Sequence, residues 1–88
     1  MPIFKKSNNK YKKYSVTTPK GNIIHFGDTR YQQYKDSTGL DMYSNLDHLD
    51  KQRRARYLIR AKGIKDKSGK LTWKDPESPN YYSVRFLW

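Results

Sequence analysis

The sequence predicts a small α+β domain, in which an N-terminal β-hairpin packs on two or three short helices. Two apolar segments flank a Pro-Lys-Gly turn between residues 11 and 26, as in a hairpin. Helix start and stop signals bracket residues 47–62, and a Ser-Pro pair at residues 78–79 is typical of another helix start. With 88 residues, the chain has the length of one domain.

The first ten residues predict a basic N-terminal arm, followed by a single domain over residues 11–88. Lysines surround a Ser-Asn-Asn stretch, a composition typical of mobile terminal segments. Ile3 and Phe4 could anchor this arm on a neighbouring molecule. The cations of the arm and of the first strand are Lys5, Lys6, Lys10, Lys12 and Lys13.

The hairpin follows from alternation on both sides of its turn. Tyr14 and Val16 share one side of the first strand, and Ile24 and Phe26 belong to the return strand. A lone hairpin is marginally stable in water, so we expect it to pack on the helices that follow.

The middle of the chain predicts a short helix and a connection. Asp28 is a candidate N-cap, and Tyr31 and Tyr34 follow at helical spacing before Ser37-Thr38-Gly39 ends the element. In the connection at residues 40–46, Met42 and Tyr43 are candidate core residues.

The clearest element is a helix from Asp47 or His48 to Lys62. Acidic residues at its start and basic residues at its end suit the helix dipole, and Gly63 is a C-terminal stop signal. Beyond it, residues 64–76 read as a loop or a short irregular hairpin. Residues 80–88 fit either a strand, because large side chains alternate there, or a helix, which the Ser78-Pro79 start favours.

The core is expected to be small and rich in aromatic side chains. Aromatic residues make up 15% of the chain, and a few large rings can hold a domain of this size. The residues expected to be mostly buried are Tyr14, Ile24, Phe26, Tyr31, Leu49, Tyr57, Leu58, Phe86 and Trp88.

Charge is the strongest functional signal. Nineteen Lys and Arg residues oppose eight Asp and Glu residues, which gives a formal net charge of +11. Such a protein attracts polyanions, so nucleic acid, an anionic membrane surface and an acidic protein face are all candidate partners. A basic protein that is merely soluble is the alternative.

Basic residues concentrate on the long helix. Arginine suits phosphate and carboxylate groups because its planar fork makes paired hydrogen bonds. The helix would lie along a phosphate backbone or an acidic protein groove. Alternatively, its arginines pair with Asp28, Asp36 or Asp47 and cover the rings of Tyr31 and Tyr57 with their stems. The helix cations expected to bind a partner are Lys51, Arg53, Arg54, Arg56 and Arg60.

Catalysis finds little support in the sequence, and no enzyme activity is expected. The chain has no cysteine and two distant histidines, and it lacks a glycine-rich phosphate loop. We therefore expect no metal, cofactor or small-molecule substrate. No apolar run approaches the roughly 20 residues of a membrane span, and no signal peptide is recognisable, so an intracellular location is expected.

Several short motifs are spread over residues 11–88. They are Tyr14-x-Val16, Lys20-Gly21, Ile24-x-Phe26-Gly27-Asp28, Tyr31, His48-x-Asp50-x-x-Arg53, Tyr57-x-x-Arg60 and Ser83-x-x-Phe86-Leu87-Trp88. Together these motifs resemble a family of small basic proteins encoded by large nucleocytoplasmic DNA viruses, namely the iridovirus, phycodnavirus, marseillevirus and mimivirus groups. The family is largely uncharacterised, so the resemblance implies a viral setting more than a mechanism.

Together, charge and resemblance predict a non-enzymatic virion component, such as a minor capsid or capsid-lining protein. It would contact viral capsid proteins, other acidic protein surfaces or the genome, in the virion and in the cytoplasm or nucleus of the infected host cell. The alternative is a sequence-independent nucleic-acid-binding protein for genome packaging or transcription, with DNA and RNA both open. A weaker option is a regulator that docks on a host protein.

Overall fold

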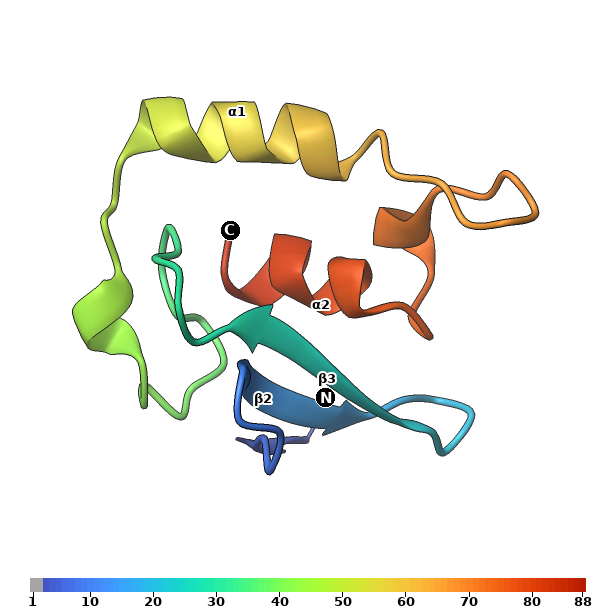
Figure 1. Cartoon of the computed structure of the whole chain (residues 1–88), viewed down its shortest axis with the longest axis horizontal. Coiled ribbons are helices and arrows are strands. Elements are labelled where there is room, and N and C mark those ends of the chain that lie inside the picture. The colour runs from blue at the N-terminus through green and yellow to red at the C-terminus, as the bar shows by residue number, and fades with distance from the viewer. Residues whose placement is uncertain (1–2) are drawn as a thin grey trace.

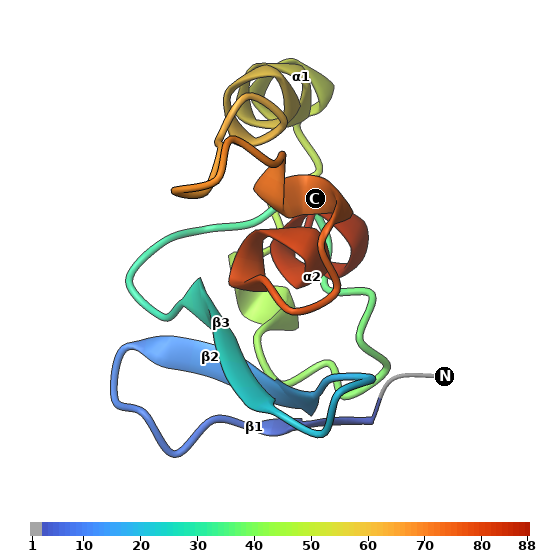
Figure 2. The same ribbon diagram turned by 90° about the vertical axis from the view of Figure 1, so that its right-hand side faces the viewer.

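The computed structural model describes residues 3–88. These residues form three layers, which are the sheet, α2 and α1 (Figure 1, Figure 2). Helix α2 covers one face of a three-stranded antiparallel sheet, and helix α1 lies over α2. This confirms the α+β class. The elements are β1 (Phe4–Lys6), β2 (Lys12–Thr17), β3 (Ile23–Asp28), α1 (Lys51–Ala61) and α2 (Pro79–Phe86), with 3₁₀ turns at Ser44–Leu46 and Thr72–Lys74.

The predicted N-terminal arm is wrong for residues 4–6, which form an edge strand of the sheet, and residues 7–10 connect this strand to β2. Strand β1 pairs with β2, with Phe4 opposite Val16 and Lys6 opposite Tyr14. The Phe4 ring meets the Phe86 ring edge-on, with centroids 4.6 Å apart, so it packs on its own domain and not on a neighbouring molecule. Burial of this one large side chain favours an ordered strand over a mobile arm. Residues 1 and 2 of the predicted arm lie outside the described part.

The predicted hairpin is confirmed as β2 and β3, and its turn is tied to the segment that precedes α2. The Thr18 amide donates to the Asn22 carbonyl at 2.7 Å, and Gly21 supplies the positive φ of 83° that the turn requires. The Glu77 carboxylate accepts hydrogen bonds from the Thr18 hydroxyl at 2.5 Å and the Asn22 side-chain amide at 3.0 Å. The sheet and the C-terminal helix are thus joined by polar as well as apolar contacts.

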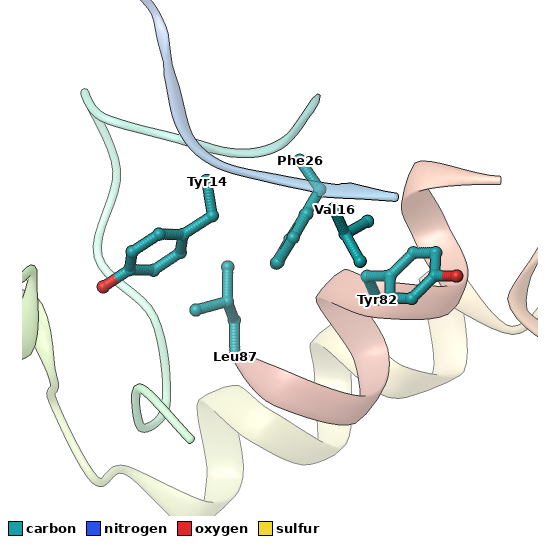
Figure 3. Packing of buried hydrophobic residues seen from close by; sticks show 5 residues of the cluster. All are labelled: Tyr14, Val16, Phe26, Tyr82 and Leu87. Carbon is teal, nitrogen blue, oxygen red and sulfur yellow. The ribbon is translucent and has the colours of Figure 1, made fainter. Parts of the chain in front are cut away.

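The core lies between the sheet and α2. Five fully buried side chains meet there: Tyr14, Val16, Phe26, Tyr82 and Leu87 (Figure 3). The Phe26 ring centroid is 6.0 Å from that of Tyr14 and 5.8 Å from that of Tyr82. Tyr14 and Phe26 were expected in the core, and Ile24, Phe86 and Trp88 pack against it as partly buried residues.

The prediction of a buried side chain is wrong for three residues. Tyr31 is 64% exposed, Leu49 is 58% exposed and Met42 is 48% exposed. The short helix that would have carried Tyr31 inward does not form. Leu49 lies outside any helix at a φ of 55°, so its side chain does not join the apolar face of α1.

Residues 29–43 are irregular because their backbone groups bind distant partners. The Gln33 amide donates to the Leu46 carbonyl, the Lys35 amide to the Leu87 carbonyl and the Ser37 amide to the Phe86 carbonyl. A helix would instead use carbonyls four residues earlier. The prediction of a helix starting at Asp28 therefore fails because tertiary hydrogen bonds replace local ones.

Both observed helices start at capping residues. Asp50 caps α1 by accepting from the Gln52 and Arg53 amides at 3.0 and 3.1 Å, so α1 starts later than predicted from Asp47. Asp47 instead accepts from Gln33 and is unavailable as a cap. The Ser78 side chain caps α2 with proline at the first helical position, which confirms the helix and excludes the strand alternative.

A candidate basic cleft beside helix α1

A cleft of about 580 Å³ opens between α1 and the loop that follows β3. One wall is the face of α1 that carries Arg53, Arg56 and Arg60. The opposite wall comes from Asp28, Tyr31 and Gln32, and the end of α2 supplies Ser83, Leu87 and Trp88. The remaining lining residues are Lys13, Gly27 and Tyr57.

The three cleft arginines have no carboxylate partner within residues 3–88. The one ion pair in this part of the chain joins Arg30 to Asp28 at 2.8 Å. Arg53 donates to the neutral side-chain oxygen of Gln32 at 2.8 Å. The expected pairing of these arginines with internal acids is therefore wrong, and their charge is not neutralised by a carboxylate of the described chain. The expected cover of Tyr57 is found for Arg60, whose guanidinium lies 5.9 Å from the Tyr57 ring centroid.

The carboxylates of Asp28, Asp36 and Asp47 accept hydrogen bonds from groups other than these three arginines. Two nitrogens of Arg30 donate to the Asp28 carboxylate, and these hydrogen bonds lower the pKa of Asp28 to about 2. Asp36 accepts from the Tyr14 hydroxyl and from Thr38. Asp47 accepts from the side-chain amide of Gln33 at 2.7 Å and from the Asp36 backbone amide at 2.9 Å.

Lys13 lies in the floor of the cleft and is not the surface cation that the sequence predicted. It is 1% exposed, and its ammonium donates to the Tyr31 carbonyl at 2.8 Å and to the Gln33 side-chain oxygen at 2.5 Å. Burial lowers the pKa of Lys13 to about 8, although the nearby Asp28, Asp36 and Asp47 carboxylates oppose this shift.

Stability should depend on this buried lysine above neutral pH. In the folded chain Lys13 releases its proton near pH 8, whereas in the unfolded chain it keeps it until about 10.5. The unfolded state then binds more protons, so the free energy of unfolding should rise from about pH 8 to about pH 9.5. Urea titrations across this range measure the slope.

Lys13→Met serves as the control for this pH dependence, because it keeps an unbranched chain and removes the titrating group. The rise should disappear in this variant, whatever its absolute stability. A flat profile in the unchanged protein, or an equal slope in the variant, would contradict the assignment. Burial and the Asp36 hydrogen bond raise the pKa of Tyr14 to about 12 in the folded chain. Above about pH 10 the unfolded chain therefore loses this proton first, and the free energy of unfolding falls with pH. For this reason the measurements stay below pH 10.

The other predicted cations lie on different surfaces. Arg54 turns to the body of the protein, where its Nε donates to the Trp88 carbonyl at 2.8 Å and its guanidinium lies 5.0 Å from the Tyr34 ring centroid. Lys51 is exposed in the first turn of α1, outside the cleft lining. Strands β1 and β2 and the turn between them carry Lys5, Lys6, Lys10 and Lys12. The structure thus joins only Lys13, Arg53, Arg56 and Arg60 of the predicted set in the cleft.

Aromatic side chains of the cleft fall into two groups. The rings of Tyr57 and Trp88 stack at 4.0 Å with an angle of 10°, and this pair connects α1 to the end of α2. Tyr31 is 64% exposed and presents its ring to solvent. Sequence reasoning missed Gln32 as a cleft residue, because nothing in the local pattern places it opposite α1. It placed Tyr31 near the α1 arginines only in the alternative in which their stems cover its ring.

A second basic cluster surrounds Trp73. The Lys62 and Lys74 ammonium groups lie 4.9 and 5.3 Å from the indole ring centroid, and the Arg85 guanidinium lies at 5.6 Å. Arg85 also lies 4.1 Å from the Tyr81 ring centroid. The spacing of Arg85 from Ser83 and Leu87 places it on the side of α2 away from the cleft.

Within residues 3–88, no three histidine or acidic side chains come together in an arrangement that could hold a metal ion. Over the same residues, neither helix has the length and apolar character that a membrane crossing requires.

These features define a small α+β protein with a basic cleft and a separate basic and aromatic cluster. Residues 3–38 match a family of unknown function (DUF5754), which is less than half of the chain. The matched part comprises the whole sheet and Lys13, whereas both helices lie outside it. No similarity to a curated protein or to a solved structure reaches significance.

Proposed function

We propose that this protein is a non-enzymatic structural component of a virus particle, such as a minor capsid or capsid-lining protein. It would bind acidic faces of capsid proteins, or the genome, through its basic surfaces. The viral setting rests on the resemblance of the sequence to small basic proteins of large nucleocytoplasmic DNA viruses. Its location would be the virion and the cytoplasm or nucleus of the infected cell.

The observation that carries this proposal is the row of arginines on α1 without internal carboxylate partners. Among residues 3–88, the single ion pair uses Arg30 and Asp28. The guanidinium groups of Arg53, Arg56 and Arg60 therefore keep their charge for carboxylate or phosphate oxygens of another molecule, although Arg53 has one nitrogen bound to the neutral Gln32 side chain.

The distribution of charge favours assembly over a single binding footprint. Cations gather in the cleft, around Trp73 and on the β1 and β2 segment, which are separate parts of the fold. A protein that contacts acidic neighbours on several sides can link them, as a component between capsid proteins must. Charge complementarity of this kind guides encounter and register more than it adds affinity.

The alternative is sequence-independent nucleic-acid binding for genome packaging or transcription. The juxtaposition of the arginine row and the exposed Tyr31 ring favours it, because phosphates and bases are recognised by these two groups.

A co-sedimentation titration separates the two functions. At about 0.15 M salt, where the Debye length is about 8 Å, the protein should stay with purified, nuclease-treated virus shells. Substituting Arg53, Arg56 and Arg60 together by Gln should release it, whereas Lys51→Gln should not. Release of the unchanged protein from shells, with retention on DNA at that salt, would overturn the assembly proposal and favour the alternative.

A further inference from the structure

We propose that the cleft beside α1 binds a single-stranded segment of nucleic acid, with phosphates on Arg53, Arg56 and Arg60 and a base stacked on Tyr31. This inference goes beyond the proposed function, because it assigns one site to one class of ligand. It holds whether the protein works in the shell or on the genome.

The arginine row matches a chain of phosphates. Arg53, Arg56 and Arg60 follow one face of α1, and the helix rise of 1.5 Å per residue places the outer two about 10 Å apart along the axis. Successive phosphates of one strand can meet successive guanidinium groups over this distance. Lys13 uses hydrogen bonds on Tyr31 and Gln33, so it adds positive potential from the floor without a direct contact.

The charge in the opposite wall does not cancel this row. Asp28 is the one acidic side chain that lines the cleft, and Arg30 holds its carboxylate through two nitrogens at 2.8 and 3.0 Å. An entering phosphate would therefore meet a neutralised pair on that side and guanidinium groups on the other.

Tyr31 is placed to stack on a base. The residue is 64% exposed, with the Arg30 guanidinium 5.8 Å from its ring centroid, and its backbone carbonyl is fixed by the Lys13 ammonium at 2.8 Å. A fixed backbone with an exposed ring gives an aromatic platform that loses little freedom on binding. Bases of single strands stack on such platforms, and those of a duplex are already stacked on one another.

Shape and chemistry favour a single strand over the other polyanions. A volume of about 580 Å³ lies within the range of sites that take a small organic ligand, so the cleft can admit one nucleotide unit. A duplex would place its phosphates at the rim. An acidic peptide would satisfy the arginines but would place no ring against the exposed side of Tyr31.

Fluorescence anisotropy with a short labelled oligothymidylate tests the proposal. A hairpin duplex of equal length and polyglutamate serve as competitors at about 0.15 M salt. The oligothymidylate should bind most tightly. Tyr31→Ala should weaken it roughly tenfold, which is within the range for loss of one stacked base. Tyr11→Ala removes another exposed ring outside the cleft and should have little effect.

Salt dependence distinguishes the roles of the two walls. For single strands the log–log slope changes by about 0.7 for each phosphate contact. Arg56→Gln should weaken binding and reduce the slope by about that amount, whereas Tyr31→Ala should leave the slope unchanged. Lys51→Gln removes the same charge from the same helix outside the cleft, so its slope should match that of the unchanged protein.

Three results would overturn the inference. Equal effects of Arg56→Gln and Lys51→Gln would mean diffuse attraction to the whole surface. Equal effects of Tyr31→Ala and Tyr11→Ala would exclude stacking in the cleft. Tighter binding of the hairpin or polyglutamate would assign the cleft to another ligand. Retention by virus shells is a separate measurement, so failure of the cleft proposal can be told apart from failure of the proposed function.

Discussion

Phe26→Ala is expected to lower the free energy of unfolding by about 3–5 kcal/mol, the range for removing a buried aromatic ring. Phe26 is completely buried in β3 and lies against the rings of Tyr14, Tyr82 and Phe4. Because small domains are stable by only about 5–15 kcal/mol, this loss removes a large share of the total. Urea denaturation followed by circular dichroism measures it.

Ile23→Ala is the matched control in the same strand. Ile23 is 68% exposed, so its truncation should change the free energy of unfolding by no more than about 0.5 kcal/mol. Similar losses in the two variants would mean that the contacts between the sheet and α2 do not dominate stability.

Trp88→Ala should detach α1 while the sheet remains folded. The Trp88 ring stacks on Tyr57 of α1 at 4.0 Å, and the Trp88 carbonyl accepts from Arg54 at 2.8 Å. An isolated helix of 11 residues is marginal in water, so α1 depends on this contact for its structure. We expect a cost of roughly 3 kcal/mol for the α1 unit, with loss of amide protection confined to residues 51–61.

Hydrogen exchange resolved by residue checks this prediction. Ile59→Ala is the control, because Ile59 lies on the same helix and is 79% exposed. Its protection pattern should match that of the unchanged protein. If α1 amides stay protected in Trp88→Ala, another contact must hold the helix.

Elements specified by neighbouring residues were predictable from the sequence. The Ser78-Pro79 pair gave the start of α2, and the Pro19 to Gly21 turn gave the hairpin. The prediction failed over residues 28–36 and at the start of α1, where local patterns favoured a helix but the backbone binds residues far along the chain. Phe4 belongs to the same class of error, because its partners Val16 and Phe86 are distant in sequence.

Only the part of the candidate site that lies on one helix could be predicted from the sequence, because the rest depends on contacts between residues far apart in the chain. The α1 arginines could be recognised as a cluster because helical spacing alone brings them together. Tyr31 enters the alternative in which arginine stems cover its ring, but its exposed position in the wall opposite them depends on the fold. Lys13 alternates with the core residue Tyr14, which predicted a solvent-facing side chain, yet the Tyr31 and Gln33 segment folds over it.

The position of the core between the first and last elements affects the order of events during synthesis. The sheet is complete at Asp28, but Tyr82 and Leu87, which cover its apolar face, emerge from the ribosome much later. At about 5–20 residues per second, the intervening segment takes on the order of several seconds to make. During this interval Tyr14, Val16 and Phe26 have no cover from the C-terminal helix. We therefore expect folding to finish only after the C-terminal helix is released, with the nascent sheet a natural client for ribosome-associated chaperones.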